Sequence, residues 1–397
     1  MTANKMIGIG TRIVRSAGRL HSDSKQAITC ILITDTLITD TTMTEKELTY
    51  YTGLVDRLEA DRDLTDEEFA AVLFCDDPGF ADYLAERARA VREIHYGKAV
   101  YLRGLIEFTN YCKNNCYYCG IRRGNANAER YRLNEEVILA CCAAGYELGF
   151  RTFVLQGGED PYFTDERMVS IVKAIKDQHP DCAVTLSIGE RDRESYQKLF
   201  DAGADRYLLR HETADKAHYG MLHPAELSFD HRMQCLRDLK DIGYQVGCGM
   251  MVGSPYQTPE HLVKDLRFLQ GFRPEMVGIG PFIPHHDTQF ADRTAGTVEM
   301  TVRLLAVIRL LLPDVLLPAT TALGTIDPVG REKGLMAGAN VVMPNLSPAD
   351  VRGKYLLYDN KKYSGDEAAE AVRDMVKRIA STGYEAVVGR GDHANFV

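Results

Sequence analysis

Apolar positions repeat with a helical period at the start of the chain and with a shorter, strand-like period later. From residue 44 to residue 94 they recur at three- and four-residue steps, which is typical of amphipathic helices. Thr65 and Glu68 have capping-box spacing, and Asp77-Pro-Gly ends the helix that they open. The pattern predicts three helices over residues 43–100, a helical cap that leads into the next segment.

Short apolar runs then alternate with helical stretches over residues 101–345. Predicted strands cover residues 102–108, 151–156, 183–187, 206–210, 245–252, 276–280, 316–319 and 339–343. Predicted helices cover residues 134–149, 164–178, 193–202, 229–242, 258–271, 298–312 and 329–338. Eight repeats over about 240 residues favour an α/β fold, a (β/α)8 TIM-type barrel, over a doubly wound open sheet.

The two ends of the chain differ from this central pattern. Residues 346–397 contain one strong helix, 366–381, and are expected to pack across one end of the barrel as a helical tail. Residues 1–42 are rich in Ser and Thr, with five basic residues and one acid before residue 27. This extension resembles an organelle transit peptide, but Met43 also looks like a natural start, and the second interpretation is favoured. We expect the extension to be disordered or not native.

Composition narrows the class of protein. The chain has 397 residues, is 45% hydrophobic and 26% charged, and carries a formal net charge of -9 without a basic block, so nucleic-acid binding is not supported. Its longest apolar run, Val302 to Leu312, contains Arg303 and Arg309, which argues against a membrane span. Ten irregularly spaced cysteines indicate reduced thiols and a cytoplasmic protein, with organelle import left open if residues 1–42 are native.

Three of these cysteines lie together in Cys112-Lys-Asn-Asn-Cys116-Tyr-Tyr-Cys119, directly after the first predicted strand. Three thiolates are one fewer than the four that normally complete an iron–sulfur or structural zinc site, which leaves one metal position open for chemistry. Two alternatives are three unrelated cysteines and a closed site with a distant fourth ligand. Zinc sites favour paired CxxC motifs, and no partner pair is present.

In a parallel barrel, functional side chains collect where strands end. Each such position taken alone has an ordinary structural explanation, but their shared location beside the cysteine loop indicates one site. These positions hold, in strand order, the three cysteines; Gln156, Gly157, Gly158 and Glu159; Ser187 and Glu190; Arg210, His211 and Glu212; Met250, Met251 and Gly253; Gly280, Pro281 and Phe282, followed by His285 and His286; Thr320 and Thr321; and Met343, Pro344 and Asn345.

An iron with an open position can chelate the amine and carboxylate of a small amino acid, and S-adenosylmethionine (SAM) is the obvious case. Glu159 and nearby carbonyls suit its ammonium, and an arginine suits its carboxylate through the geometry of the guanidinium. Tyr118 offers a flat face to the purine. Such a site must also exclude water, because a primary radical reacts with whatever it meets.

The cysteine spacing, with an aromatic residue before the last thiol, resembles the signature of the radical SAM superfamily, and Gly157-Gly-Glu resembles its ammonium-binding motif. Over residues 102–358 the chain resembles the HydE family of FeFe-hydrogenase maturases more closely. Biotin synthase and methylornithine synthase share only part of this pattern. The stretches that carry the HydE resemblance are residues 106–110, 155–162, 185–190, 204–213, 276–285 and 318–322.

This resemblance implies a complete barrel and a 4Fe-4S cluster on Cys112, Cys116 and Cys119. It implies SAM contacts at Ser187, at Glu212 through the ribose and at Arg232 through the carboxylate. It also implies a substrate cavity lined by Arg210, Gln156, Thr320, Thr321, Met343, Tyr355 and Tyr358. Some family members bind a second cluster on cysteines near the C-terminus. The last cysteine here is Cys248, so one cluster is expected.

The implied function is maturation of the hydrogenase H-cluster. A 5′-deoxyadenosyl radical would attack the sulfur of an iron carbonyl–cyanide–cysteine precursor of the diiron subcluster, supplied by the maturase HydG, with HydF as a further candidate partner. One alternative is an enzyme like methylornithine synthase or biotin synthase. Another is a non-catalytic iron–sulfur scaffold, which would have no need for the ammonium-binding motif.

Overall fold

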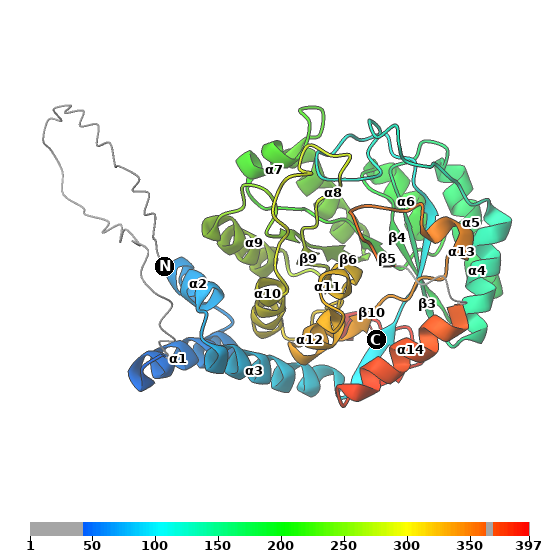
Figure 1. Cartoon of the computed structure of the whole chain (residues 1–397). Coiled ribbons are helices and arrows are strands. Elements are labelled where there is room, and N and C mark those ends of the chain that lie inside the picture. Colours follow the sequence, from blue (N-terminus) through cyan, green and yellow to red (C-terminus); the bar gives the residue numbers. More distant parts are fainter. Residues whose placement is uncertain (1–42, 363–367, 397) are drawn as a thin grey trace, which may run out of the picture. The chain divides into compact units, whose positions relative to one another are not determined.

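Three N-terminal helices pack against the outer helices that surround a ring of parallel strands (Figure 1). The computed structural model describes residues 43–362 and 368–396, so the expectations for residues 1–42 lie outside the described residues. The helices are α1 (Glu45–Asp61), α2 (Asp66–Phe74) and α3 (Pro78–Tyr96), and capping boxes open the first two. Helix α3 packs along α10 (Val298–Leu311), and α2 along α9 (Pro259–Phe272). The helical cap therefore covers outer helices of the barrel.

Six strands form one parallel sheet in the order β2-β3-β4-β5-β6-β8. Their order in space follows their order in the chain, as successive right-handed strand–helix–strand units produce. They are β2 (Gly104–Thr109), β3 (Thr152–Gly157), β4 (Ala183–Ser187), β5 (Arg206–Leu208), β6 (Gln245–Cys248) and β8 (Met276–Val277).

Two further segments join the edges of this sheet. Leu316 pairs in parallel with Met276 of β8, and Pro318 pairs with Val341 of β10 (Val341–Val342). Asn345 then pairs in parallel with Leu105 of β2, which returns to the first strand. These bridges complete eight parallel positions around a ring. The fold is a (β/α)8 TIM-type barrel, and the open doubly wound sheet is excluded.

The helices that follow the strands surround the ring and bury their apolar sides in one continuous core with the outer faces of the strands (Figure 1). Besides α9 and α10 they are α4 (Glu135–Glu147), α5 (Asp165–Gln178), α6 (Arg193–Asp201), α8 (Phe229–Ile242) and α12 (Gly330–Met336). The sequence predicted all of these to within a few residues. It did not predict two short helices, α7 (Lys216–Leu222) and α11 (Thr321–Ile326).

The predicted strands 206–210 and 339–343 are shorter in the structure, as β5 and β10, and 316–319 is represented by isolated bridges at Leu316 and Pro318. Three other predicted strands are interrupted. The first is split into β1 (Ala99–Leu102) and β2. The fifth and sixth are split after Cys248 and Val277, and they continue as β7 (Met251–Val252) and β9 (Gly280–Pro281). At this break Gly249 has a φ of 152°, and a Cβ there would lie 2.0 Å from the carbonyl oxygen of Gly278. Each of the two strands is interrupted where Gly249 lies against Gly278. The prediction that these strands are continuous was therefore wrong.

The C-terminal tail closes the end of the barrel where the strands begin. Its elements are α13 (Ala349–Arg352), α14 (Ala368–Ser381), β11 (Glu385–Val387) and a 3-10 turn, Ala394–Phe396. Strand β11 pairs in parallel with β1. Arg206, which is fully buried at the start of β5, donates to Asp392 over 2.6 Å and to the Arg390 carbonyl over 2.7 Å. These contacts lie at the end where the strands begin, whereas Leu357 and Lys361 of the same tail contact the cysteine loop and β2.

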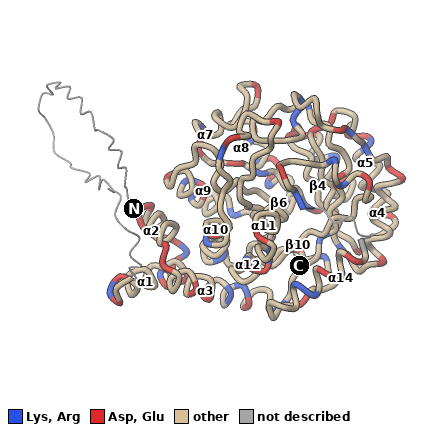
Figure 2. The backbone as a smooth tube through the Cα atoms, viewed as in Figure 1, with Lys and Arg blue, Asp and Glu red and all other residues tan. Residues whose placement is uncertain are grey.

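Basic and acidic side chains alternate over the described part of the chain, without a long stretch of one sign (Figure 2). Within residues 43–362 and 368–396, no helix has the length and apolar character needed to cross a bilayer.

Candidate radical SAM site

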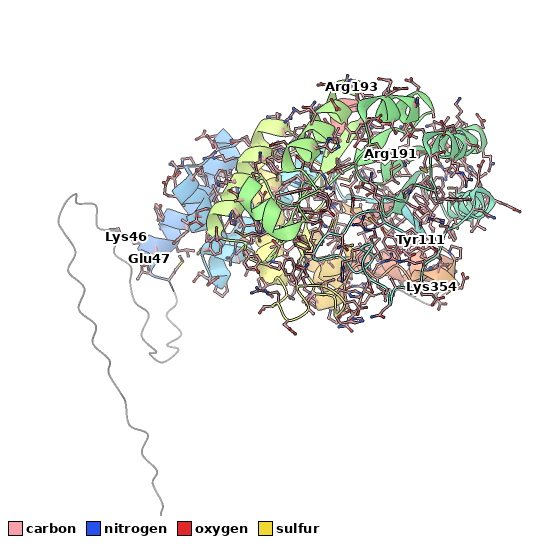
Figure 3. The ribbon with its side chains drawn as sticks, turned by 90° about the horizontal axis from the view of Figure 1, so that it is seen from above. Lys46, Glu47, Tyr111, Arg191, Arg193 and Lys354 are labelled. Carbon is pink, nitrogen blue, oxygen red and sulfur yellow. The ribbon has the colours of Figure 1, made fainter. Side chains whose placement is uncertain are left out.

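The cysteine loop follows β2 and is held in place mainly by backbone groups from other elements. The amide of Lys113 donates to the Glu159 carbonyl over 2.8 Å, and that of Tyr117 donates to the Leu222 carbonyl over 3.1 Å. The amide of Gly120 donates to Leu357, in the tail, over 2.9 Å. The same side of the molecule carries Tyr111 and Lys354, which Figure 3 labels close to each other. The loop is therefore clamped by three separate parts of the chain.

One arginine organises the second half of this loop. The Arg130 guanidinium donates to carbonyl oxygens at four positions, residues 110, 121, 122 and 125. A planar fork of donors can satisfy several carbonyls of an irregular loop at once, which a lysine could not do with fixed geometry. Nothing in the sequence motif pointed to this residue.

The three thiols lie near enough to act electrostatically on one another. Burial raises the pKa of Cys112 and Cys116 and raises that of Cys119 to about 12, and the neighbouring thiols add to the shift for Cys116 and Cys119. Three thiols that repel one another's negative charge are stable as thiolates only around a positive centre. The loop thus presents the ligand set of a metal cluster with one position left open.

Glycines allow the end of β3 to lie directly against the cysteine loop. A Cβ on Gly158 would lie 2.2 Å from the Tyr111 carbonyl oxygen and 2.8 Å from the Cβ of Cys112. Glu159 follows, and its carboxylate accepts the backbone N–H of Glu190 over 2.9 Å and lies 3.3 Å from the Nζ of Lys113. The motif therefore places a buried carboxylate beside the first thiol, as an ammonium site requires.

Two charged residues predicted to contact SAM also lie close to the cysteine loop. Arg232, on α8, is 7% exposed, donates through Nε to Glu190 and through Nη1 to the Arg210 carbonyl over 2.6 Å. Glu212 is held at a left-handed φ of 65°, with its amide donating to the Gly249 carbonyl over 3.0 Å. A non-glycine residue in this region carries strain, which functional sites often tolerate to aim a side chain.

A buried histidine supports the strained turn at Glu212. The Gly249 amide donates to Nδ1 of His211 over 3.2 Å, so the ring proton is on Nε2, which lies 3.2 Å from the Asp265 carboxylate. Both side chains are fully buried. Because one nitrogen accepts and the other donates, the ring can take only one orientation.

The residues predicted to line the substrate cavity come from five different parts of the barrel and tail. Gln156 pairs with Ser187 between β3 and β4, and its Nε2 lies 3.4 Å from the Tyr355 hydroxyl. A cavity of about 430 Å³ is lined by Thr321 and Met343, together with Glu107 and Lys361. Thr320 is the N-cap of α11, and the charge of Arg210 acts on the nearby Tyr358 hydroxyl. Of the seven residues predicted to line the substrate cavity, Thr321 and Met343 line this cavity, so the full lining stays a prediction.

Some buried polar atoms without a hydrogen-bond partner belong to residues around the cysteine loop and the barrel interior, while others, such as those of Arg92 and Arg303, lie elsewhere in the fold. Among the described residues the first group includes Arg210 Nε and Nη2, Glu212 Oε2, Thr320 Oγ1 and the Tyr219 hydroxyl. Arg210 Nη2 lies 3.1 Å from Glu212 Oε2 but outside hydrogen-bonding geometry. Proteins rarely leave such groups unsatisfied, so their grouping fits a polar ligand like SAM beside a cluster.

A neutral histidine fixes the tyrosine of the cysteine motif. Nδ1 of His223 lies 2.9 Å from the Tyr219 carbonyl, which can only accept, so Nδ1 carries the proton. Its Nε2 therefore accepts from the Tyr118 hydroxyl over 3.2 Å. The Tyr118 ring stands edge-on to His223, with centroids 5.4 Å apart. Neither His223 nor Tyr219 was singled out from the sequence, because α7 was missed; the only signal was Asp215, the side chain that caps it.

This arrangement predicts a stability that depends on pH. Burial lowers the pKa of His223 to about 3, against about 6.5 in an unfolded chain, so the unfolded state binds the proton more readily. The contribution is fully present above about pH 6.5 and is lost as the pH falls toward 3. We expect the free energy of unfolding to drop between pH 7 and pH 5 by about 2 kcal/mol more in the wild type than in His223→Asn, measured with urea. Equal drops in both proteins would contradict this.

Comparison with known proteins agrees with the site. The family model described as the Radical SAM superfamily matches residues 106–269. The [FeFe] hydrogenase maturase subunit HydE of Thermotoga maritima is 47% identical over 330 residues, 83% of this chain and 94% of that protein. The 3-methylornithine synthase of Methanosarcina acetivorans is 31% identical, over 81% of this chain and 90% of that one.

Two solved structures share the fold. The crystal structure of methylornithine synthase (PylB) superposes with a TM-score of 0.73 and 28% identity, covering 84% of this chain and 97% of that one. The structure of HydG, a maturase of the [FeFe]-hydrogenase, gives a TM-score of 0.71 at 20% identity, over 87% and 80% of the two chains.

Proposed function

Because the chain belongs to the HydE family of [FeFe]-hydrogenase maturases in the radical SAM superfamily, we propose that it acts on a sulfur-containing iron carbonyl–cyanide precursor of the diiron subcluster. It is a radical SAM enzyme that uses a 4Fe-4S cluster and SAM. When bound, the cluster supplies an electron that breaks a carbon–sulfur bond of SAM and gives a 5′-deoxyadenosyl radical.

The chain's own residues prepare the site for that chemistry. Cys112, Cys116 and Cys119 would hold the cluster, and Glu159 with the glycines before it would bind the SAM ammonium. Arg232 would bind its carboxylate, Glu212 its ribose, and Tyr118 and Ser187 would complete the pocket. These assignments extend the family's pattern to side chains that lie around the same three thiols.

The substrate would lie deeper in the barrel, against Gln156, Arg210, Thr320, Thr321, Met343, Tyr355 and Tyr358. We assign residues 101–345 to the catalytic unit, residues 43–100 to its outer support, and residues 346–397 to the closure of its base and cavity wall. HydG would supply the precursor, HydF is a candidate receiver, and the protein would work in the reducing cytoplasm.

The observation that carries the proposal is the carboxylate of Glu159 beside the three thiols. A protein that only carries a cluster would not need this carboxylate, because it does not bind the ammonium of SAM. Protein reconstituted without oxygen should form 5′-deoxyadenosine when SAM and dithionite are added. A protein that carries the cluster but forms no 5′-deoxyadenosine would instead be an iron–sulfur scaffold.

The substrate needs a separate test, because the chain is also similar to methylornithine synthase. Purified protein, added with the other maturases to an inactive hydrogenase, should restore hydrogen production. Turnover of SAM that increases with lysine, without hydrogenase activation, would favour the methylornithine synthase alternative.

A further inference from the structure

Tyr219 carries a buried phenol close to the cysteine loop, and packing holds its ring in place. Its ring is stacked on His223 with centroids 3.9 Å apart and meets Phe229 edge-on at 5.6 Å. The side chain is 1% exposed. Among residues 43–362 and 368–396, the hydroxyl has no hydrogen-bond partner. Packing therefore explains the position of the Tyr219 ring, but it does not explain why the residue carries a hydroxyl.

An unsatisfied buried hydroxyl costs folding free energy, because it has lost its water and gained nothing in return. Phenylalanine would fill the same space between His223 and Phe229 without that cost. The hydroxyl is thus unfavourable for the protein alone, and a ligand that binds it would compensate.

The surroundings identify the kind of ligand group. The charged groups that act on the hydroxyl are, in decreasing order, Arg232, Glu190, Cys116 and Glu212. Burial raises the pKa of Tyr219, so it stays protonated and can donate. A buried donor near the guanidinium of Arg232 suits an anionic ligand group that can accept hydrogen bonds from both side chains.

We propose that the Tyr219 hydroxyl donates a hydrogen bond to the carboxylate of SAM, beside Arg232. The inference rests on the proposed function, since it requires SAM at this site. The proposal makes α7 part of the SAM pocket. His223, at the end of α7, orients Tyr118, and Tyr219, in the middle of α7, supplies the hydroxyl that donates to SAM.

The test compares SAM binding by wild type and Tyr219→Phe, both with reconstituted clusters and without reductant, by equilibrium dialysis. Tyr219→Phe should weaken SAM binding about 10- to 100-fold, as expected for a hydrogen bond to a charged group. Decarboxylated SAM, which lacks the acceptor, should bind both proteins equally. Without SAM, the variant should unfold at the same or a higher urea concentration than the wild type.

Tyr244→Phe is the matched control. This buried hydroxyl donates to the Tyr196 carbonyl over 2.8 Å, so its removal should lower the unfolding midpoint and leave SAM affinity unchanged. Unchanged SAM affinity in Tyr219→Phe, or an equal loss for decarboxylated SAM, would overturn the assignment while leaving the proposed function intact. A wild-type protein that carries its cluster and does not bind SAM would overturn both.

Discussion

Cys116→Ser is expected to abolish both cluster binding and SAM cleavage while the barrel stays folded. The thiol lies in a loop that is held by Lys113, Tyr117 and Gly120 backbone amides, none of which needs the sulfur. Serine does not replace a thiolate as an iron ligand at neutral pH, because its hydroxyl stays protonated. The reconstituted variant should therefore lack the visible absorbance of the cluster and form no 5′-deoxyadenosine, with an unchanged circular dichroism spectrum.

Cys235→Ser is the appropriate comparison. The Cys235 thiol donates to the Arg191 carbonyl over 3.5 Å, and a hydroxyl can make the same contact away from the cluster loop. This variant should keep the cluster spectrum. A normal spectrum in Cys116→Ser, or its loss in both variants, would contradict the ligand assignment.

Lys361→Met is expected to destabilise the fold by about 3–5 kcal/mol, measured as the free energy of unfolding in urea. Lys361 reaches from the tail to Glu107 of β2, with Nζ 2.5 Å from Oε1, and also donates to the Tyr355 carbonyl over 2.8 Å. The two side chains are 7% and 1% exposed. Among the described residues, removing the cation leaves the buried Glu107 carboxylate with the Asn345 side chain as its remaining partner, 2.8 Å away.

The neighbouring residue provides the control. Lys362 is exposed, so Lys362→Met should change the free energy of unfolding by less than about 0.5 kcal/mol. The double variant Glu107→Gln/Lys361→Met should recover much of the lost stability, because neutral side chains replace both buried charges. Similar losses for Lys361→Met and Lys362→Met would show that the pair contributes little.

The sequence predicted the features that depend on local pattern. The apolar period identified the barrel helices, and the spacing of Cys112, Cys116 and Cys119 identified the cluster loop. The motif identified Gly158, but the need for a glycine there comes from the Tyr111 carbonyl, which leaves no room for a Cβ. Helix periodicity and motif spacing can be predicted from sequence because they depend on residues that are close together in the chain.

Features that depend on contacts between distant segments could not be read in this way. Arg130 and His223 have no distinctive neighbours in sequence, yet one holds the cysteine loop and the other holds Tyr118. The buried pair of Glu107 and Lys361 joins residues 254 positions apart. The breaks after Cys248 and Val277 arise because two glycine backbones meet, which neither strand shows by itself.

The tail beneath the barrel has a consequence for synthesis. Arg206 pairs with Asp392, which lies 186 residues later in the chain, and strand β1 pairs with residues 385–387. During synthesis the Arg206 guanidinium therefore leaves the ribosome long before the carboxylate that pairs with it. The end of the barrel where the strands begin can be completed only after residues 385–392 have emerged.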